Sequence, residues 1–128
     1  MHTVFVYGTL RTGASNAFRM KGARSLGEAT VSAQLYRVHD QFPGVVLGEG
    51  SVLHGEIFTD VSDHHLHALD VYEGCDDGLP VEEHLYRRVE VDAVDGNGDL
   101  VRCYIWEYVK PIADSPLIPE GDWLEAQH

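Results

Sequence analysis

The sequence is short of positive charge and has no long hydrophobic run. Nine lysine and arginine residues face 21 aspartate and glutamate residues, which gives the 128-residue chain a formal charge of −12. A field of that sign repels phosphate backbones and anionic lipid headgroups, so binding to nucleic acid is not expected. No apolar stretch approaches the roughly 20 residues that span a bilayer, and we expect no membrane association.

Cysteine is also scarce, since Cys75 and Cys103 are the two in the sequence. Two thiols cannot form a disulfide framework, although one bond between them stays open, and a reducing compartment is expected. The chain enters a strand-like run at Thr3 without the basic region, apolar stretch and small-residue cleavage site of an export signal. We therefore expect a cytoplasmic protein.

The residues that are present predict many strands. The run Thr3–Tyr7 is apolar on both alternating faces, which is typical of a central strand covered on both sides. Further strands are predicted over residues 26–38, in a hairpin over 45–59 that turns at 48–51, and in a second hairpin with arms at 85–94 and 100–109. Strands without alternating helices favour one α+β domain over residues 1–128, with a barrel-like antiparallel or mixed sheet.

Two short helices are predicted beside these strands. One covers residues 14–21, and the other begins after Ser62, a residue suited to an N-cap. The second helix carries Leu66 and Leu69 on one face and ends at Gly74.

The last third of the chain is rich in aromatic residues and proline. Three aromatic side chains alternate onto one face of the last predicted strand and form a wall against either the core or a cavity: Tyr104, Trp106 and Tyr108. Three prolines after position 110 are predicted to keep the tail out of regular sheet or helix, and Trp123 to pin it to the body.

The loop from Gly8 to Gly13 is the first candidate for a binding function. It leaves the central strand, and its glycines free the backbone to present N–H groups to an anion or a developing oxyanion. An ordinary turn fits the same spacing. The loop matches neither G-x-G-x-x-G nor G-K-[ST], so it does not predict a nucleotide site.

Glu73 is the candidate acid or base. It is predicted at the C-terminal end of a helix, where the helix dipole and partial burial would both raise the pKa of its carboxyl. Such a group exchanges protons near neutral pH. A solvated glutamate at the helix end is the simpler alternative.

Two other clusters predict chemistry less well. His64 and His67 share a helix face and can supply two metal ligands, but a third ligand is not evident and no metal site is expected. Cys75 and His84 can be considered as a thiol catalyst, but nothing in their spacing orients the imidazole on the sulfur.

Three segments together resemble one known family. Tyr7-Gly8-Thr9-Leu10-Arg11-Thr12-Gly13 resembles the Y-G-[ST]-L-x-x-G signature of the γ-glutamylcyclotransferase-like family. Leu69–Gly74 resembles its L-D-x-x-E-G signature, and Tyr86–Val91 resembles its Y-x-R-x-x-V strand. The order and spacing agree across nearly the whole chain, although residues 76–84 are longer and more acidic than the expected link.

The resemblance implies a fold, a reaction and a site. The fold would be a small mixed β-barrel with flanking short helices, and the reaction would convert γ-glutamyl amides or amines to 5-oxoproline and a free amine. Glu73 would be the general acid/base. The γ-glutamyl group would be bound chiefly by backbone groups of Tyr7, Gly8, Thr9 and Leu10, with Tyr104 and Tyr108 as looser candidates for the cavity wall.

The residues suit that chemistry without a metal or cofactor. The substrate's own α-amine attacks its γ-carbonyl, so the enzyme needs no nucleophile, and a single carboxylate can move the proton. A non-catalytic module that binds a small metabolite or a modified protein end remains an alternative, as does a metal-dependent hydrolase using His64 and His67. The leaving amine and the choice between monomer and homodimer stay open.

Overall fold

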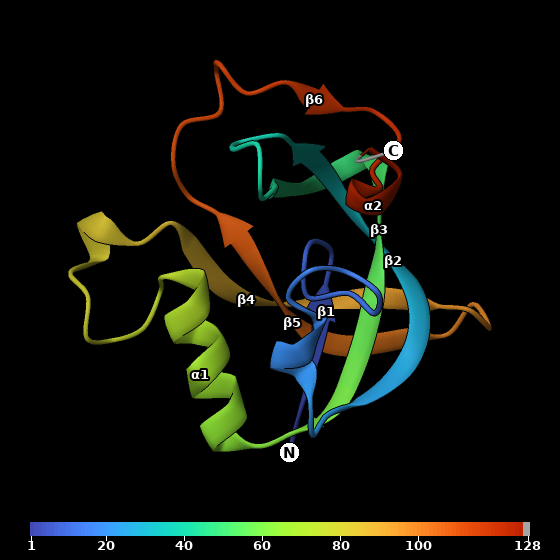
Figure 1. Cartoon of the computed structure of the whole chain (residues 1–128). Coiled ribbons are helices and arrows are strands. Elements are labelled where there is room, and N and C mark those ends of the chain that lie inside the picture. Colours follow the sequence, from blue (N-terminus) through green and yellow to red (C-terminus); the bar gives the residue numbers. More distant parts are fainter. Residues whose placement is uncertain (127–128) are drawn as a thin grey trace.

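In the computed structural model, which describes residues 1–126, five strands close into a mixed barrel (Figure 1). The elements in chain order are β1 (His2–Val6), the 3-10 helix η1 (Ala17–Met20), β2 (Arg24–Tyr36), β3 (Gly44–Val61), α1 (Asp63–Glu73), the 3-10 helix η2 (Val81–Glu83), β4 (Tyr86–Asp95), β5 (Leu100–Tyr108), β6 (Leu117–Ile118) and α2 (Trp123–Ala126). The barrel order is β3, β1, β5, β4, β2 and again β3. Since β1 runs parallel to β5 and the other pairs are antiparallel, the predicted α+β fold with a small mixed barrel is confirmed.

β1 is the central strand that its sequence predicts. Its side chains alternate between two cores, because successive residues of a strand point to opposite faces. Phe5 lies in the core inside the barrel, whereas Val4 and Val6 lie in a second core shared with Leu66 and Leu69 of α1. The end of β1 is therefore fixed from both sides.

The predicted hairpin over residues 45–59 is wrong. β3 runs through this region as one strand of 18 residues, and its antiparallel partner over most of its length is β2. The glycine-rich segment 48–51 is a bulge, since Ser32 pairs with Val52 while the next residue, Ala33, pairs with Leu47. Glycine at positive φ, here Gly50 at +100°, marks a bulge as well as a turn.

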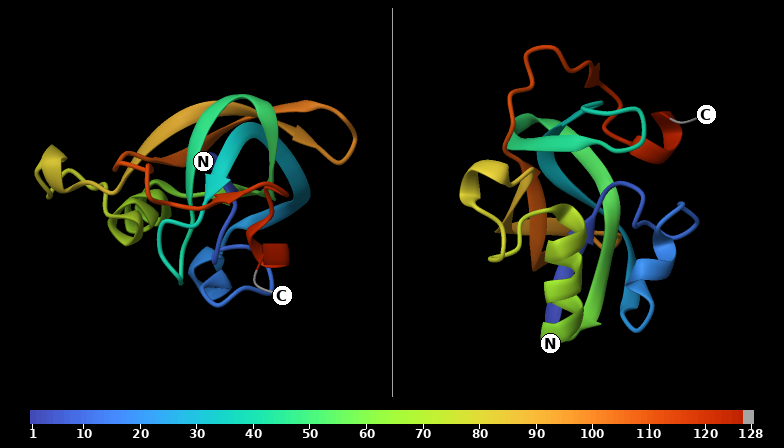
Figure 2. Two further views of the ribbon diagram at one scale, coloured as in Figure 1. Left: turned by 90° about the horizontal axis from the view of Figure 1, so that it is seen from above. Right: turned by 60° about the vertical axis from the view of Figure 1, so that its left-hand side comes forward.

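The helix after Ser62 is confirmed as α1. The Ser62 hydroxyl accepts a hydrogen bond from the His65 N–H at 3.0 Å, and Gly74 ends the helix with φ of +73°. Leu66 and Leu69 are buried, and in the right-hand view of Figure 2 the helix lies along the outside of the barrel in front of β1. Within residues 1–126 no helix is long and apolar enough to cross a membrane.

The predicted short helix over residues 14–21 is confirmed only in part, as the 3-10 helix η1. This segment forms turns followed by the short η1, and Asn16 donates its backbone N–H to the Thr9 carbonyl at 2.9 Å. Phe18 is 66% exposed while Met20 is buried, so there is too little apolar cover to stabilise an α-helix.

The later hairpin is confirmed as β4 and β5, and the aromatic face of β5 packs in the second core. The expectation of an irregular tail is wrong, because β6 pairs with β2 through Leu35 and Ile118, and α2 follows. β6 has only two residues between flanking prolines, and these two are enough to pair with β2. Trp123 pins the tail as predicted, with 1% of its surface exposed.

Candidate active site

A cavity of about 240 Å³ lies where four segments of the chain meet. The segments are the loop after β1, the β2–β3 connection, the end of α1 and the start of β4. The lining residues are Tyr7, Gly8, Thr9, Leu10, Asn16, Gln41, Phe42, Pro43, Tyr72, Glu73, Leu85 and Tyr86. Among them are one carboxylate and no lysine, arginine or histidine.

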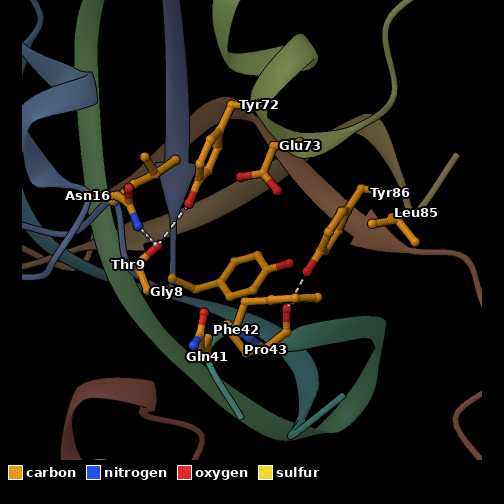
Figure 3. Close-up of a pocket in the computed structure, with 12 residues that line it drawn as sticks. Gly8, Thr9, Asn16, Gln41, Phe42, Pro43, Tyr72, Glu73, Leu85 and Tyr86 are labelled. Atoms are coloured by element: carbon orange, nitrogen blue, oxygen red, sulfur yellow. Dashed lines mark hydrogen bonds between the residues drawn. The ribbon is translucent and has the colours of Figure 1, made fainter. Parts of the chain in front are cut away.

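Glu73 places its carboxyl in this cavity. Figure 3 shows the carboxylate between Tyr72 and Tyr86, facing the side on which Gly8 and Phe42 lie. Burial, and secondarily the negative charge of Asp70, raise the pKa of Glu73 to about 8. The carboxyl is thus able to hold or release a proton near neutral pH, as its position at the helix end predicts.

Two tyrosines beside Glu73 connect the segments that line the cavity through hydrogen bonds from their hydroxyl groups. The Tyr7 hydroxyl donates to the Trp106 carbonyl at 2.6 Å, and the Tyr86 hydroxyl donates to the Pro43 carbonyl at 2.5 Å. Burial, aided by the Glu73 charge, raises the pKa of both phenols, so both remain neutral donors. The bond from Tyr86 fixes the β2–β3 connection against β4.

The loop after β1 presents free backbone donors. Within residues 1–126, the N–H groups of Gly8, Thr9 and Leu10 have no hydrogen-bond acceptor, although all three residues line the cavity. Gly8 itself is not at positive φ; a Cβ there would lie 3.1 Å from the ring of Pro43, so a larger residue would press on that ring.

Buried ionic contacts hold this loop in place. Thr12 donates its backbone N–H and its hydroxyl to the Glu56 carboxylate at 2.8 and 2.6 Å, and Ser25 donates to the same carboxylate at 2.6 Å. Arg11, which is 6% exposed, pairs with Asp122 at 3.0 Å. The loop is therefore organised before any ligand binds.

Thr9 also connects the loop to α1. Its hydroxyl lies 3.1 Å from the Tyr72 hydroxyl and accepts from the Asn16 amide at 3.1 Å (Figure 3). Because Tyr72 immediately precedes Glu73, this contact relates the loop to the carboxyl across the cavity.

The structure brings five of the predicted site residues together and leaves two outside the lining. Glu73 and the segment Tyr7–Leu10 line one cavity. Tyr104 lies elsewhere, with the Arg88 guanidinium 4.6 Å from its ring centre. Tyr108 lies behind the wall, where its ring packs against Tyr86 with centroids 5.4 Å apart.

Sequence reasoning missed seven lining residues: Asn16, Gln41, Phe42, Pro43, Tyr72, Leu85 and Tyr86. Tyr72 and Tyr86 belong to the two later motifs and could have been found from them. The segment Gln41–Pro43 carries no local signal, because it reaches the cavity through the pairing of β2 with β3.

The alternative clusters do not form sites. His64 and His67 are exposed on α1, and within residues 1–126 no three His, Cys, Asp or Glu side chains are placed to hold a metal ion. Burial and the adjacent Asp70 raise the pKa of the Cys75 thiol to about 12, which leaves it unreactive. The His84 ring contacts the carbonyls of Asp76 and Leu79 and not the thiol.

Comparison with known proteins gives a consistent result. Residues 4–125 match the family described as Gamma-glutamyl cyclotransferase, AIG2-like. The chain is 36% identical over 126 residues to a Vibrio cholerae protein of the gamma-glutamylcyclotransferase type, covering 97% of this chain and 96% of that protein. It is 32% identical over 118 residues to Gamma-glutamylaminecyclotransferase of Rattus norvegicus, covering 83% and 77%. The crystal structure of an AIG2-like protein from Mus musculus superposes with a TM-score of 0.74 at 25% identity, covering 89% of this chain and 81% of that one.

Proposed function

Since the chain belongs to the gamma-glutamyl cyclotransferase, AIG2-like family, we propose that it converts a γ-glutamyl amide or amine to 5-oxoproline and a free amine. Glu73 is the general acid/base of this reaction. The observation that carries the proposal is the position of the Glu73 carboxyl, which shares one cavity with Gly8, Thr9 and Leu10, three residues whose N–H groups have no acceptor within residues 1–126.

The reaction balances without water or an enzyme nucleophile. Glu73 takes a proton from the substrate α-ammonium, and the freed amine attacks the γ-carbonyl carbon. A bond forms between the α-nitrogen and that carbon, Glu73 returns the proton to the leaving nitrogen, and the bond from the carbon to that nitrogen breaks. The second proton that the α-nitrogen loses as the lactam forms passes through the same carboxylate to the free amine. A pKa of about 8 suits this transfer, because a carboxyl with that pKa can both accept and return a proton near neutral pH.

Backbone N–H donors can stabilise the negative charge that develops on the substrate during the reaction. Negative charge develops on the γ-carbonyl oxygen as the ring closes, and fixed N–H groups stabilise it without reorganising. The γ-glutamyl group also carries an α-carboxylate, and the cavity lining offers it no cationic side chain. We therefore assign two sets of donors to the γ-carbonyl and the α-carboxylate of the substrate. These are the N–H groups of the loop and the side-chain amides of Asn16 and Gln41.

The class of leaving group follows from the relatives and from the cavity. One relative is named for γ-glutamylamines, and the aromatic and apolar side chains of Phe42 and Leu85 also line the cavity. An amine on an aliphatic chain would pack against these two residues. We infer that amines and amides, including amino acids and lysine side chains, are the compounds to test.

The experiment is a product assay on the purified protein. It is incubated with γ-glutamyl derivatives of an amino acid, a lysine side chain, a polyamine and cysteinylglycine, and each reaction is analysed for 5-oxoproline, glutamate and free amine. We expect 5-oxoproline and the amine in equal amounts from at least one compound. Release of glutamate would contradict cyclisation, and saturable binding without product would support the binding-module alternative instead.

We also propose that the reaction takes place in the cytoplasm. Cys75 and Cys103 are both free thiols, which suits a reducing compartment. Burial raises the pKa of Cys103 to about 11, so this thiol too has no tendency to act as a nucleophile.

A further inference from the structure

Asp70 is a largely buried carboxylate beside the cavity that the reaction as described does not use. It lies three residues before Glu73 on α1, a spacing that places both on one side of the helix. Its Oδ1 atom accepts a hydrogen bond from the Trp106 indole N–H at 3.0 Å. The same oxygen lies 3.5 Å from Nε of Arg88 and accepts from the Cys75 thiol at 3.7 Å.

Trp106 connects this carboxylate with the opposite wall of the cavity. Its side chain donates to Asp70, while its backbone carbonyl accepts from the Tyr7 hydroxyl at 2.6 Å. Trp106 is 2% exposed and lies on β5, beside β1. One rigid residue of the barrel thus holds both the last turn of α1, which carries Glu73, and the end of β1, where the donor loop starts.

Besides its hydrogen bond with Trp106, Asp70 affects Glu73 through its negative charge. The titratable groups that face Glu73 are Asp70 on α1, Cys75 after it, Tyr7 at the end of β1 and Tyr86 on β4. Arg88 on β4 faces Asp70, and the adjacent Tyr72 directs its hydroxyl to Thr9. The thiol and both phenols are neutral, because burial raises the pKa of each. Asp70 is therefore the nearby group whose charge acts on the Glu73 carboxyl.

We propose that Asp70 is the positioning residue of Glu73: its hydrogen bond with Trp106 fixes the last turn of α1, and with it the Glu73 carboxyl, opposite the donor loop, and its negative charge acts on that carboxyl in addition to burial. The proposal rests on the proposed function for its effect on turnover. The placement and charge can be measured without turnover.

The charge effect is tested by following the Glu73 side chain in the NMR spectrum of protein labelled with ¹³C-glutamate, with Glu73→Gln used to assign the signal. We expect a titration midpoint near pH 8 in the wild type and a lower midpoint in Asp70→Asn, because the smaller of the two causes that raise it is removed. Asp63→Asn, an exposed carboxylate in the first turn of the same helix, is the matched control and should leave the midpoint unchanged. Equal midpoints in the wild type and Asp70→Asn would overturn the proposal.

If Asp70→Asn does not fold, Asp70→Ser tests the same effect with a smaller uncharged side chain. Removing the Asp70 charge in this way should again lower the Glu73 midpoint, and a raised or unchanged midpoint would contradict the proposal.

The positioning effect is tested with Trp106→Phe, which removes the indole donor and keeps the Asp70 charge. We expect kcat to fall more than KM changes, while the Glu73 midpoint stays raised. Wild-type kcat in this variant would overturn the positioning role. A wild type that forms no 5-oxoproline would instead reject the proposed function, and the NMR titrations would still decide whether Asp70 acts on Glu73.

Discussion

At the scale of single residues, the carboxylate of Glu56 shows how the site is organised before substrate arrives. Burial alone would raise the pKa of Glu56, but hydrogen bonds from Ser25 and Thr12, with Arg11 nearby, bring its pKa below the ordinary value of 4.5. Its partner Thr12 lies in the donor loop that starts at Gly8. An anionic Glu56 therefore stabilises the fold and the loop together.

Glu56→Gln should destabilise the protein by about 2 kcal/mol at pH 7, because charge-assisted hydrogen bonds to Thr12 and Ser25 are lost. A lowered folded pKa contributes stability that is present above the ordinary pKa and is lost as the pH falls through the folded value. The difference from wild type should thus shrink below about pH 4.5. Urea unfolding across pH measures this.

Glu49→Gln, an exposed position on the same strand, is the control and should match wild type at each pH. A Glu56→Gln deficit that grows on acidification would show that the carboxylate is not held as an anion.

At the residue scale, sequence reasoning found Glu73 and the loop. It could not decide between a functional site and the simpler alternative of an ordinary turn and a solvated glutamate. The raised pKa of Glu73 comes mainly from burial, and the cavity that buries it is lined by Tyr7 and Tyr86, which come from distant parts of the chain. The three motifs indicated that these residues belong to the signatures of one family. Their contacts were available only from the fold.

At the scale of elements, α1 was predictable because its signals are local. The Ser62 cap, the pair Leu66 and Leu69, and the terminal Gly74 lie within 13 consecutive positions and each acts on the same helix. The hairpin over residues 45–59 was not predictable in this way. Its glycines specify a bulge in β3 only when the pairing partner, β2, is known.

Ser62→Ala should lower the free energy of unfolding by about 1 kcal/mol, because the His65 N–H loses its acceptor at the start of α1. Glu73 lies at the other end of the helix, so kcat should stay at the wild-type value. Chemical denaturation and the 5-oxoproline assay measure the two quantities.

Ser115→Ala is the matched control, since the Ser115 hydroxyl makes no hydrogen bond within residues 1–126, and it should change neither quantity. A large loss of kcat in Ser62→Ala would mean that the whole helix, and not its last turn, determines the position of Glu73.

At the scale of the whole molecule, barrel closure is what creates the cavity. Pairing of β2 with β3 brings residues 41–43 opposite the loop after β1, and the packing of α1 against β1 in the second core brings the end of α1 beside that loop (Figures 1 and 3). The fold class could be predicted because a strand-rich composition is visible in the local sequence. Most of the cavity wall could not be predicted, because it depends on these long-range pairings.

The most direct test of the central claim compares 5-oxoproline formation by the wild type and by Glu73→Gln. Glutamine keeps the size of the side chain and removes the carboxyl group that takes up and releases the proton, so the account predicts a fall in kcat of at least about 100-fold with an unchanged circular dichroism spectrum. Glu83→Gln, an exposed position between α1 and β4, should retain wild-type kcat. A folded Glu73→Gln variant with kcat within a few-fold of wild type would contradict the account.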